Sequence, residues 1–111
     1  MFGDIFNTTE VDRHADWIVE ELKRSLPPGF DATRDDVARR AAKVHERIAK
    51  RTVELTQKTR LNIYKKARLA ARVRELMGAH GYRADFIKSF SYDVIAGLQL
   101  VSGRPGQGSR R

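Results

Sequence analysis

The sequence predicts an all-α protein, a three- or four-helix bundle or hairpin built around one long, basic central helix. Three observations predict this class. Apolar residues recur at intervals of three and four, no stretch alternates with a period of two, and glycine and proline are concentrated between the periodic stretches. The chain has 111 residues, of which 41% are hydrophobic and 32% charged, so one modest core is expected and a multilayer enzyme fold is not.

The first helix is expected over residues 9–25. Thr9 is suited to cap it, with Asp12 at the third helical position, and Pro27, Pro28 and Gly29 stop it and form a turn. The residues that recur on its apolar face are Val11, Ala15, Ile18 and Leu22.

The longest predicted element follows. Thr33 and Asp36 are suited to cap its start, and no glycine or proline occurs before Gly78, which allows one helix of about 70 Å. Three threonines in residues 52–59 lower the local helix propensity, so a kink or a short break is expected there if the helix is interrupted. One apolar seam runs along the whole element through Val37, Ala41, Val44, Ile48, Thr52, Leu55, Thr59, Ile63, Ala67, Ala70, Val73 and Met77.

Gly78 and Gly81 are expected to end the long helix, because a residue in the left-handed conformation commonly does so. A last helix is predicted over residues 84–101, with a broad apolar face of Phe86, Ile87, Phe90, Val94, Ile95, Leu98 and Val101. We therefore expect one helical domain over residues 1–102 and a disordered basic tail over residues 103–111.

Basic residues are concentrated in the middle of the chain. Residues 34–74 carry fourteen basic and four acidic side chains, whereas residues 1–33 carry three basic and seven acidic ones. On a helical wheel, ten of the basic side chains lie within about 120° of one another, opposite the apolar seam, and only Asp36 and Glu54 interrupt this face. These ten residues, called the basic stripe below, are Arg39, Arg40, Lys43, Arg47, Lys50, Arg51, Lys58, Lys65, Arg68 and Arg72.

Three interpretations of the basic stripe are open. An exposed stripe favours sequence-nonspecific binding of DNA or RNA, because each basic side chain that neutralises a phosphate releases counterions. In the second interpretation, the stripe is a solvated face, or the acidic side chains of the first helix, from Glu10 to Glu21, lie alongside it and mask part of it. The third is binding to a membrane surface or to another polyanion. A base-reading helix-turn-helix is disfavoured, since the helix after Gly81 is apolar and nearly neutral.

The sequence contains no motif that indicates catalysis, metal binding or cofactor binding. There is no cysteine, and His14, His45 and His80 fall on three different elements without a second ligand at helical spacing. His45 is expected to be a hydrogen-bonded core or interface histidine and His80 to cap a helix end. No nucleotide loop or nucleophile motif occurs, so no enzyme is predicted.

The remaining expectations concern partners and location. A long helix with an apolar seam exceeds what the flanking helices cover side by side, so a homodimer is predicted, and the alternative function is a helical protein-interaction or assembly module with a possible acidic protein partner. The amino terminus has no signal-peptide pattern and no segment is apolar enough for a membrane span, so a cytoplasmic location without membrane contact is expected.

Overall fold

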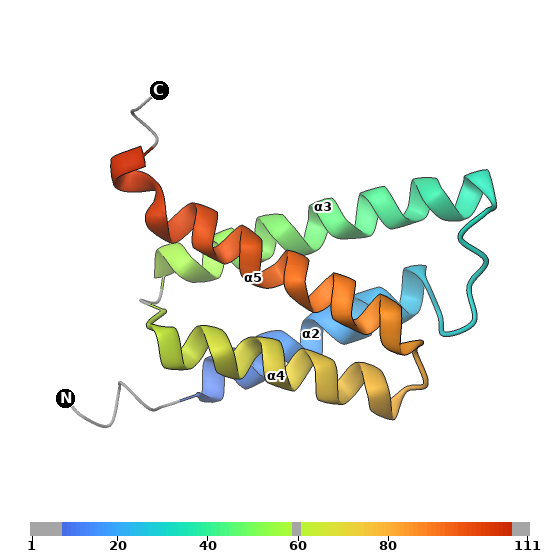
Figure 1. The fold of residues 1–111 in the computed structure, drawn as a ribbon, viewed down its shortest axis with the longest axis horizontal. Helices are drawn as coiled ribbons and strands as arrows, with labels where there is room; N and C mark the ends of the chain where they lie inside the picture. Colours follow the sequence, from blue (N-terminus) through green and yellow to red (C-terminus); the bar gives the residue numbers. More distant parts are fainter. Residues whose placement is uncertain (1–7, 59–60, 108–111) are drawn as a thin grey trace.

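The computed structural model describes residues 8–58 and 61–107, and from residue 95 onward it describes the side chain of Ala96 alone. These residues form four helices: α2 (Thr9–Ser25), α3 (Asp35–Lys58), α4 (Ile63–Ala79) and α5 (Ala84–Gln107) (Figure 1). Every regular element in residues 8–58 and 61–107 is a helix. The predicted all-α class is therefore confirmed.

Each helix packs against two of the others. α2 and α5 each contact both α3 and α4, and Figure 1 shows α3 and α4 along opposite edges of the molecule. The core lies where the four helices meet. Its largest fully buried side chains come from every helix and include Ile18, Leu22, Val44, Leu69, Val73 and Phe90.

α2 confirms the predicted apolar face, because Val11, Ala15, Ile18 and Leu22 are all buried. The helix also ends at Ser25, as predicted. Its start differs by one residue: Thr8 takes the N-cap position in place of Thr9, and its hydroxyl lies 3.3 Å from a carboxylate oxygen of Asp12.

The turn after α2 is set by proline and glycine. The Phe30 N–H donates to the Pro27 carbonyl at 3.1 Å, and Gly29 has a φ of 88°, in the left-handed region that the third position of a type II turn requires. Thr33 does not cap α3, contrary to the sequence-based expectation. Its backbone N–H and its hydroxyl instead donate to the Asp31 carboxylate, at 3.0 and 2.6 Å.

The predicted single long helix is wrong, because the segment forms two helices. α3 ends at Lys58 and α4 begins at Ile63, and α4 returns along the molecule in the opposite direction (Figure 1). One local contribution comes from Asn62, whose backbone is extended and whose side-chain oxygen accepts a hydrogen bond from the Lys65 N–H at 2.8 Å. This is a helix N-cap, and it stabilises a new helix start just beyond residues 52–59, the threonine-rich segment in which an interruption is expected.

The break changes which residues are buried on α4. On α3, Val37, Val44, Ile48 and Thr52 are buried as predicted, and on α4 the same holds for Ala70, Val73 and Met77. The first turns of α4 differ, since Ile63 is 84% exposed and Ala67 is also exposed, whereas Leu69 is fully buried. A helix that starts anew is free to face the core with a different phase, so the seam of α3 does not continue into α4.

α4 ends in a hydrogen-bonded glycine turn. The Tyr82 N–H donates to the Met77 carbonyl and the Gly81 N–H donates to the Gly78 carbonyl, both at 3.1 Å. Gly81 has a φ of 90°, so these bonds form a Schellman motif. Gly78 lies within the helix, and His80 occupies the C-cap position, as the sequence predicts.

This turn provides a matched pair of glycine substitutions. We expect Gly81→Ala to lower the free energy of unfolding by about 1 to 2 kcal/mol, because the left-handed conformation is costly for any residue with a Cβ atom. Gly78→Ala is expected to raise it by about 0.5 to 1 kcal/mol, since the helix gains a better helix former. A Cβ atom meets no neighbour within 4 Å at either position, so urea unfolding of the two variants isolates the backbone effect. Equal changes in the free energy of unfolding of the two variants would contradict the assignment of Gly81 as the left-handed residue of the Schellman motif.

α5 begins at Ala84, as predicted, and continues to Gln107, beyond the predicted end at Val101. Of its predicted apolar face, Phe90 is buried, and Phe86, Ile87 and Val94 are half-buried. The predicted members Ile95, Leu98 and Val101 lie outside the described side chains. Of the expected tail, residues 103–107 belong to α5, and residues 108–111 lie outside the described residues.

Candidate nucleic-acid interface

The basic stripe is divided between two helices. Seven of its ten residues lie on α3, and Lys65, Arg68 and Arg72 lie on α4. Because α3 and α4 run along opposite edges of the molecule and do not contact each other within the described residues, the ten side chains do not form one continuous surface. This corrects the expected stripe.

The α4 members of the basic stripe face the acidic residues of α2. Arg68 donates two hydrogen bonds to the Asp12 carboxylate, at 2.9 and 3.1 Å, and these bonds hold the pKa of Asp12 below its usual value. Arg72 lies 3.7 Å from Asp16 in a second ion pair with α2. Lys65 is only 8% exposed, so it is part of the packed interior and not of an open surface.

Two α3 members are also engaged close to the end of α2. Arg47 donates to the Glu21 carboxylate at 3.1 Å, where Glu21 is held in a largely covered position. Arg40 donates to the Asp36 carboxylate at 3.2 Å and to the Ser25 carbonyl at 3.1 Å. The interpretation in which the first helix masks part of the stripe is therefore confirmed for Arg47, Arg68 and Arg72.

Arg51 takes part in a stack that joins α3 to α2. Its guanidinium lies 5.0 Å from the centre of the Trp17 ring, and Trp17 in turn stacks on His14 at 5.6 Å between ring centres. The Thr52 hydroxyl donates to the Ile48 carbonyl at 2.7 Å, so its oxygen accepts from His14 Nε2 at 2.8 Å. Burial, with a smaller effect of the Arg51 charge, lowers the pKa of His14 to about 4, and the imidazole is neutral at physiological pH.

Four basic residues of α3 make neither an ion pair nor an aromatic contact in the part of the chain that the structure describes. All four are exposed; Arg39, Lys43 and Lys50 lie on the side of α3 away from the buried Val44 and Ile48, whereas Lys58, at the end of the helix, lies nearer to the buried side. We call them the outer row: Arg39, Lys43, Lys50 and Lys58.

The outer row has a simple geometry. From residue 39 to residue 58 the helix advances about 28 Å at the usual rise per residue. Glu46 and Glu54 are exposed on the same helix and lower its net positive charge. α3 carries no phenylalanine, tyrosine or tryptophan, so the outer row offers charge without an aromatic stacking surface.

The three histidines lie on α2, on α3 and at the end of α4. Among the described residues, no group of three or more histidine, cysteine or acidic side chains is arranged to hold a metal ion. His45 donates from Nδ1 to the Ala41 carbonyl at 2.9 Å and packs edge-on against Phe90, which confirms the expected hydrogen bond, and the residue is half-buried. No helix in this part of the chain has the length and apolar character needed to cross a bilayer.

Fold and surface together define a class: an all-helical protein in which one helix presents an unpaired basic row. Comparisons of the chain with protein-family models, with curated proteins and with solved structures found no significant match.

Proposed function

We propose that the four helices form one bundle and that its outer row binds DNA or RNA without sequence preference, in a protein that is not an enzyme. The observation that carries this proposal is the contrast between the α4 members of the basic stripe and the outer row of α3. Acidic residues of α2 neutralise Arg68 and Arg72, whereas the outer row faces solvent with no such partner among the described residues.

Exposed basic side chains that make no ion pair are available to neutralise phosphates. Arg39 and Lys43 are four residues apart and repel each other by a few tenths of a kcal/mol, whereas Glu46 and Glu54 stand three or four residues from Lys43, Lys50 and Lys58. A phosphate backbone relieves the repulsion between Arg39 and Lys43, and each neutralised phosphate releases counterions. Four such contacts predict that log K falls with log salt with a slope of about −3.6 on duplex DNA.

A pair of triple charge reversals tests the proposal. We expect Arg39→Glu, Lys43→Glu and Lys50→Glu together to weaken binding to a labelled 20-base-pair duplex at least about tenfold, because three of four phosphate contacts are lost. The control is Arg13→Glu, Arg74→Glu and Lys88→Glu, which changes the net charge equally at exposed positions on the three other helices. Fluorescence anisotropy measures both affinities, and circular dichroism verifies helicity.

The control decides what a loss of affinity means. A large loss in the outer-row variant and a small loss in the control supports a local binding surface. Equal losses would show that only net charge matters. If the unsubstituted protein did not bind the duplex even at low salt, the proposal would be contradicted outright. The outer-row variant leaves out Arg47 and Arg51, because their contacts with Glu21 and Trp17 contribute to folding.

A protein-interaction or assembly module is the second candidate function. Ile63 and Tyr92 are 84% and 70% exposed, which is unusual for large apolar side chains and favours a partner surface. The length of the predicted helix does not support a homodimer, however, because α4 folds back and buries most of the seam within one chain, with Ile63 and Ala67 left exposed. Sedimentation equilibrium tests this candidate, since a homodimer requires a mass that rises with protein concentration.

A further inference from the structure

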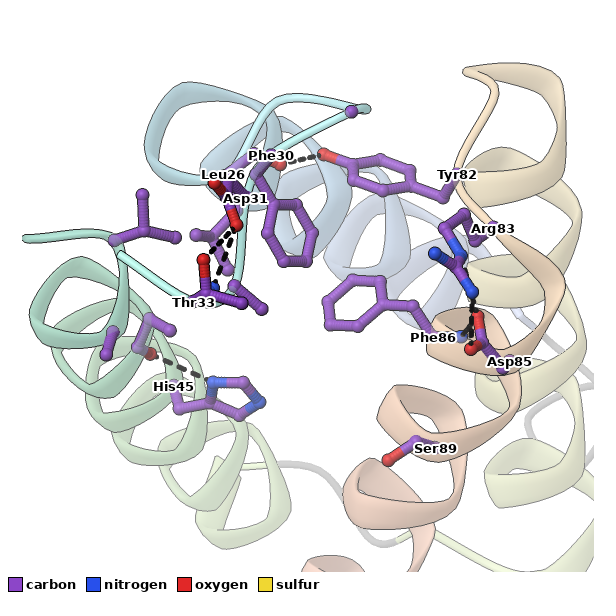
Figure 2. Close-up of a pocket in the computed structure, with 15 residues that line it drawn as sticks. Leu26, Phe30, Asp31, Thr33, His45, Tyr82, Arg83, Asp85, Phe86 and Ser89 are labelled. Atoms are coloured by element: carbon purple, nitrogen blue, oxygen red, sulfur yellow. Dashed lines mark hydrogen bonds and ion pairs between the residues drawn. The ribbon is translucent and has the colours of Figure 1, made fainter. Parts of the chain in front are cut away.

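The loop after α2, the first half of α3 and the start of α5 line a groove of about 750 Å³ (Figure 2). In Figure 1 these segments lie at the end of the molecule opposite the break between α3 and α4. The walls of the groove are the loop after α2, from Leu26 to Thr33, the first half of α3, and the segment from Tyr82 to Ser89. A volume of this size is typical of small-molecule sites, which range from about 300 to 1,000 Å³. The groove contains no residue of the outer row, so it is independent of the proposed function.

Three aromatic rings form the apolar part of the groove. Phe30 and Phe86 meet edge to face at 5.0 Å between centres, and Tyr82 packs against Phe86 at 5.8 Å. The Tyr82 hydroxyl donates to the Leu26 carbonyl at 2.7 Å, which ties the start of α5 to the end of α2. The rings are therefore held in place before any ligand arrives.

His45 contributes a fixed hydrogen-bond acceptor. Because its Nδ1–H donates to the Ala41 carbonyl, the neutral ring carries its lone pair on Nε2. Figure 2 shows the imidazole extending from α3 into the groove, with the Ser89 hydroxyl directed inward from the opposite wall. A ligand that offers an N–H or O–H group complements Nε2.

The charge of the groove differs in sign from that of the chain. Arg83 and Asp85 form a two-point ion pair, at 3.3 and 3.1 Å, and cancel each other. Asp31 has no basic partner among the described residues, and the hydrogen bonds from Thr33 hold the pKa of its carboxyl below the usual value, so it is ionised at neutral pH. The groove thus carries one uncompensated negative charge in a chain of formal charge +8.

We propose that this groove binds a small organic ammonium ion with an aromatic or apolar body. The body packs against Phe30 and Phe86, whose ring faces also attract a cation. The ammonium group donates to the Asp31 carboxylate or to His45 Nε2. An organic anion of the same shape is repelled by the unpaired Asp31 carboxylate, and Arg83 is already neutralised by Asp85.

Three probes of nearly equal shape test this selectivity: 2-phenylethylamine, 2-phenylethanol and 3-phenylpropionate. Each is titrated into the full-length protein at physiological salt and followed by amide chemical shifts in ¹H–¹⁵N spectra. We expect the amine to bind at least about tenfold more tightly than the carboxylate, with the alcohol between them, and the largest shifts at Phe30, His45 and Phe86.

Two variants and a control keep the proposal falsifiable. Asp31→Asn retains an acceptor for Thr33 but removes the charge, and is expected to weaken amine binding about fivefold and leave the alcohol unchanged. Ala41→Phe fills the groove and is expected to abolish binding of all three probes, whereas Asp93→Asn, outside the groove, changes nothing.

Four results would overturn the proposal. They are no shift with any probe at about 10 mM, equal or tighter binding of the carboxylate, amine binding that survives Ala41→Phe, and self-association that covers the groove with a second copy of the chain.

Discussion

Replacing Phe90 by alanine is expected to lower the free energy of unfolding by about 3 to 5 kcal/mol. Phe90 is 2% exposed and lies where α5 packs on α3, with its ring 5.3 Å from that of His45 and 5.9 Å from that of Phe86. Truncation removes these aromatic contacts and leaves a cavity that the four helices are unable to close fully. Since small domains unfold at a cost of about 5 to 15 kcal/mol, the variant loses a large share of its stability.

The same helix supplies the control. Tyr92 lies two residues further along α5 and is 70% exposed, so Tyr92→Ala is expected to change the free energy of unfolding by less than about 0.5 kcal/mol. Urea unfolding followed by far-ultraviolet circular dichroism measures both variants. A loss of less than 1 kcal/mol in Phe90→Ala would mean that the α3–α5 contact is not part of the cooperative core.

Acid is expected to destabilise the protein through His14 well before the carboxylates are protonated. The pKa of His14 is lowered from 6.5 to about 4 in the folded chain, mainly by burial. The unfolded chain therefore takes up a proton below about pH 6.5 that the folded chain does not. The contribution of His14 to the free energy of unfolding is fully present above pH 6.5, and the free energy of unfolding falls by up to about 3 kcal/mol as the pH approaches 4.

A variant separates His14 from the other titrating groups. His14→Gln keeps an N–H donor for the Thr52 oxygen but does not titrate, so its stability is expected to change much less between pH 6.5 and 4. Asp12 and Asp36 also have lowered pKa values, that of Asp36 about 2, and their effect on stability appears at lower pH. Parallel pH profiles of the wild-type chain and the variant, measured by urea unfolding, would refute the role of His14.

Local signals predicted the all-α class, the buried face of α2 and several helix boundaries correctly. The apolar spacing on α2 identifies Val11, Ala15, Ile18 and Leu22, and the structure buries all four. The boundary at Ser25 follows from Pro27 and Gly29, and the end of α4 from Gly81, because these residues restrict or extend the backbone conformation locally. Such signals act within a few residues and need no knowledge of tertiary packing.

The prediction of one long helix is wrong because the break between α3 and α4 depends on tertiary contacts. Asn62 is an N-cap residue type, but the third helical position holds Lys65 and not an acidic partner, so the capping-box pattern is missing. The apolar spacing also continues through Ile63 and Ala67, which are exposed in the folded chain. What favours the break is the burial of Leu61 and Leu69 against the other helices, which periodicity alone does not contain.

The candidate sites depended even more on the arrangement of helices. The basic residues of α3 were identifiable from their spacing, but which of them are unpaired depends on the position of α2, whose Glu21 reaches Arg47. The groove was not predicted at all. Phe30, His45 and Phe86 belong to three separate segments, and no spacing along the chain indicates that they meet.

The stack of Arg51, Trp17 and His14 gives the protein an optical reporter of its own. Trp17 is the single tryptophan of the chain, so its fluorescence on selective excitation arises from the joint between α2 and α3 and from nowhere else. Separation of the two helices exposes the indole to water and shifts its emission to longer wavelength. A protonated imidazole also quenches indole emission more strongly than a neutral one, so the intensity at constant fold records the charge of His14 without any added label.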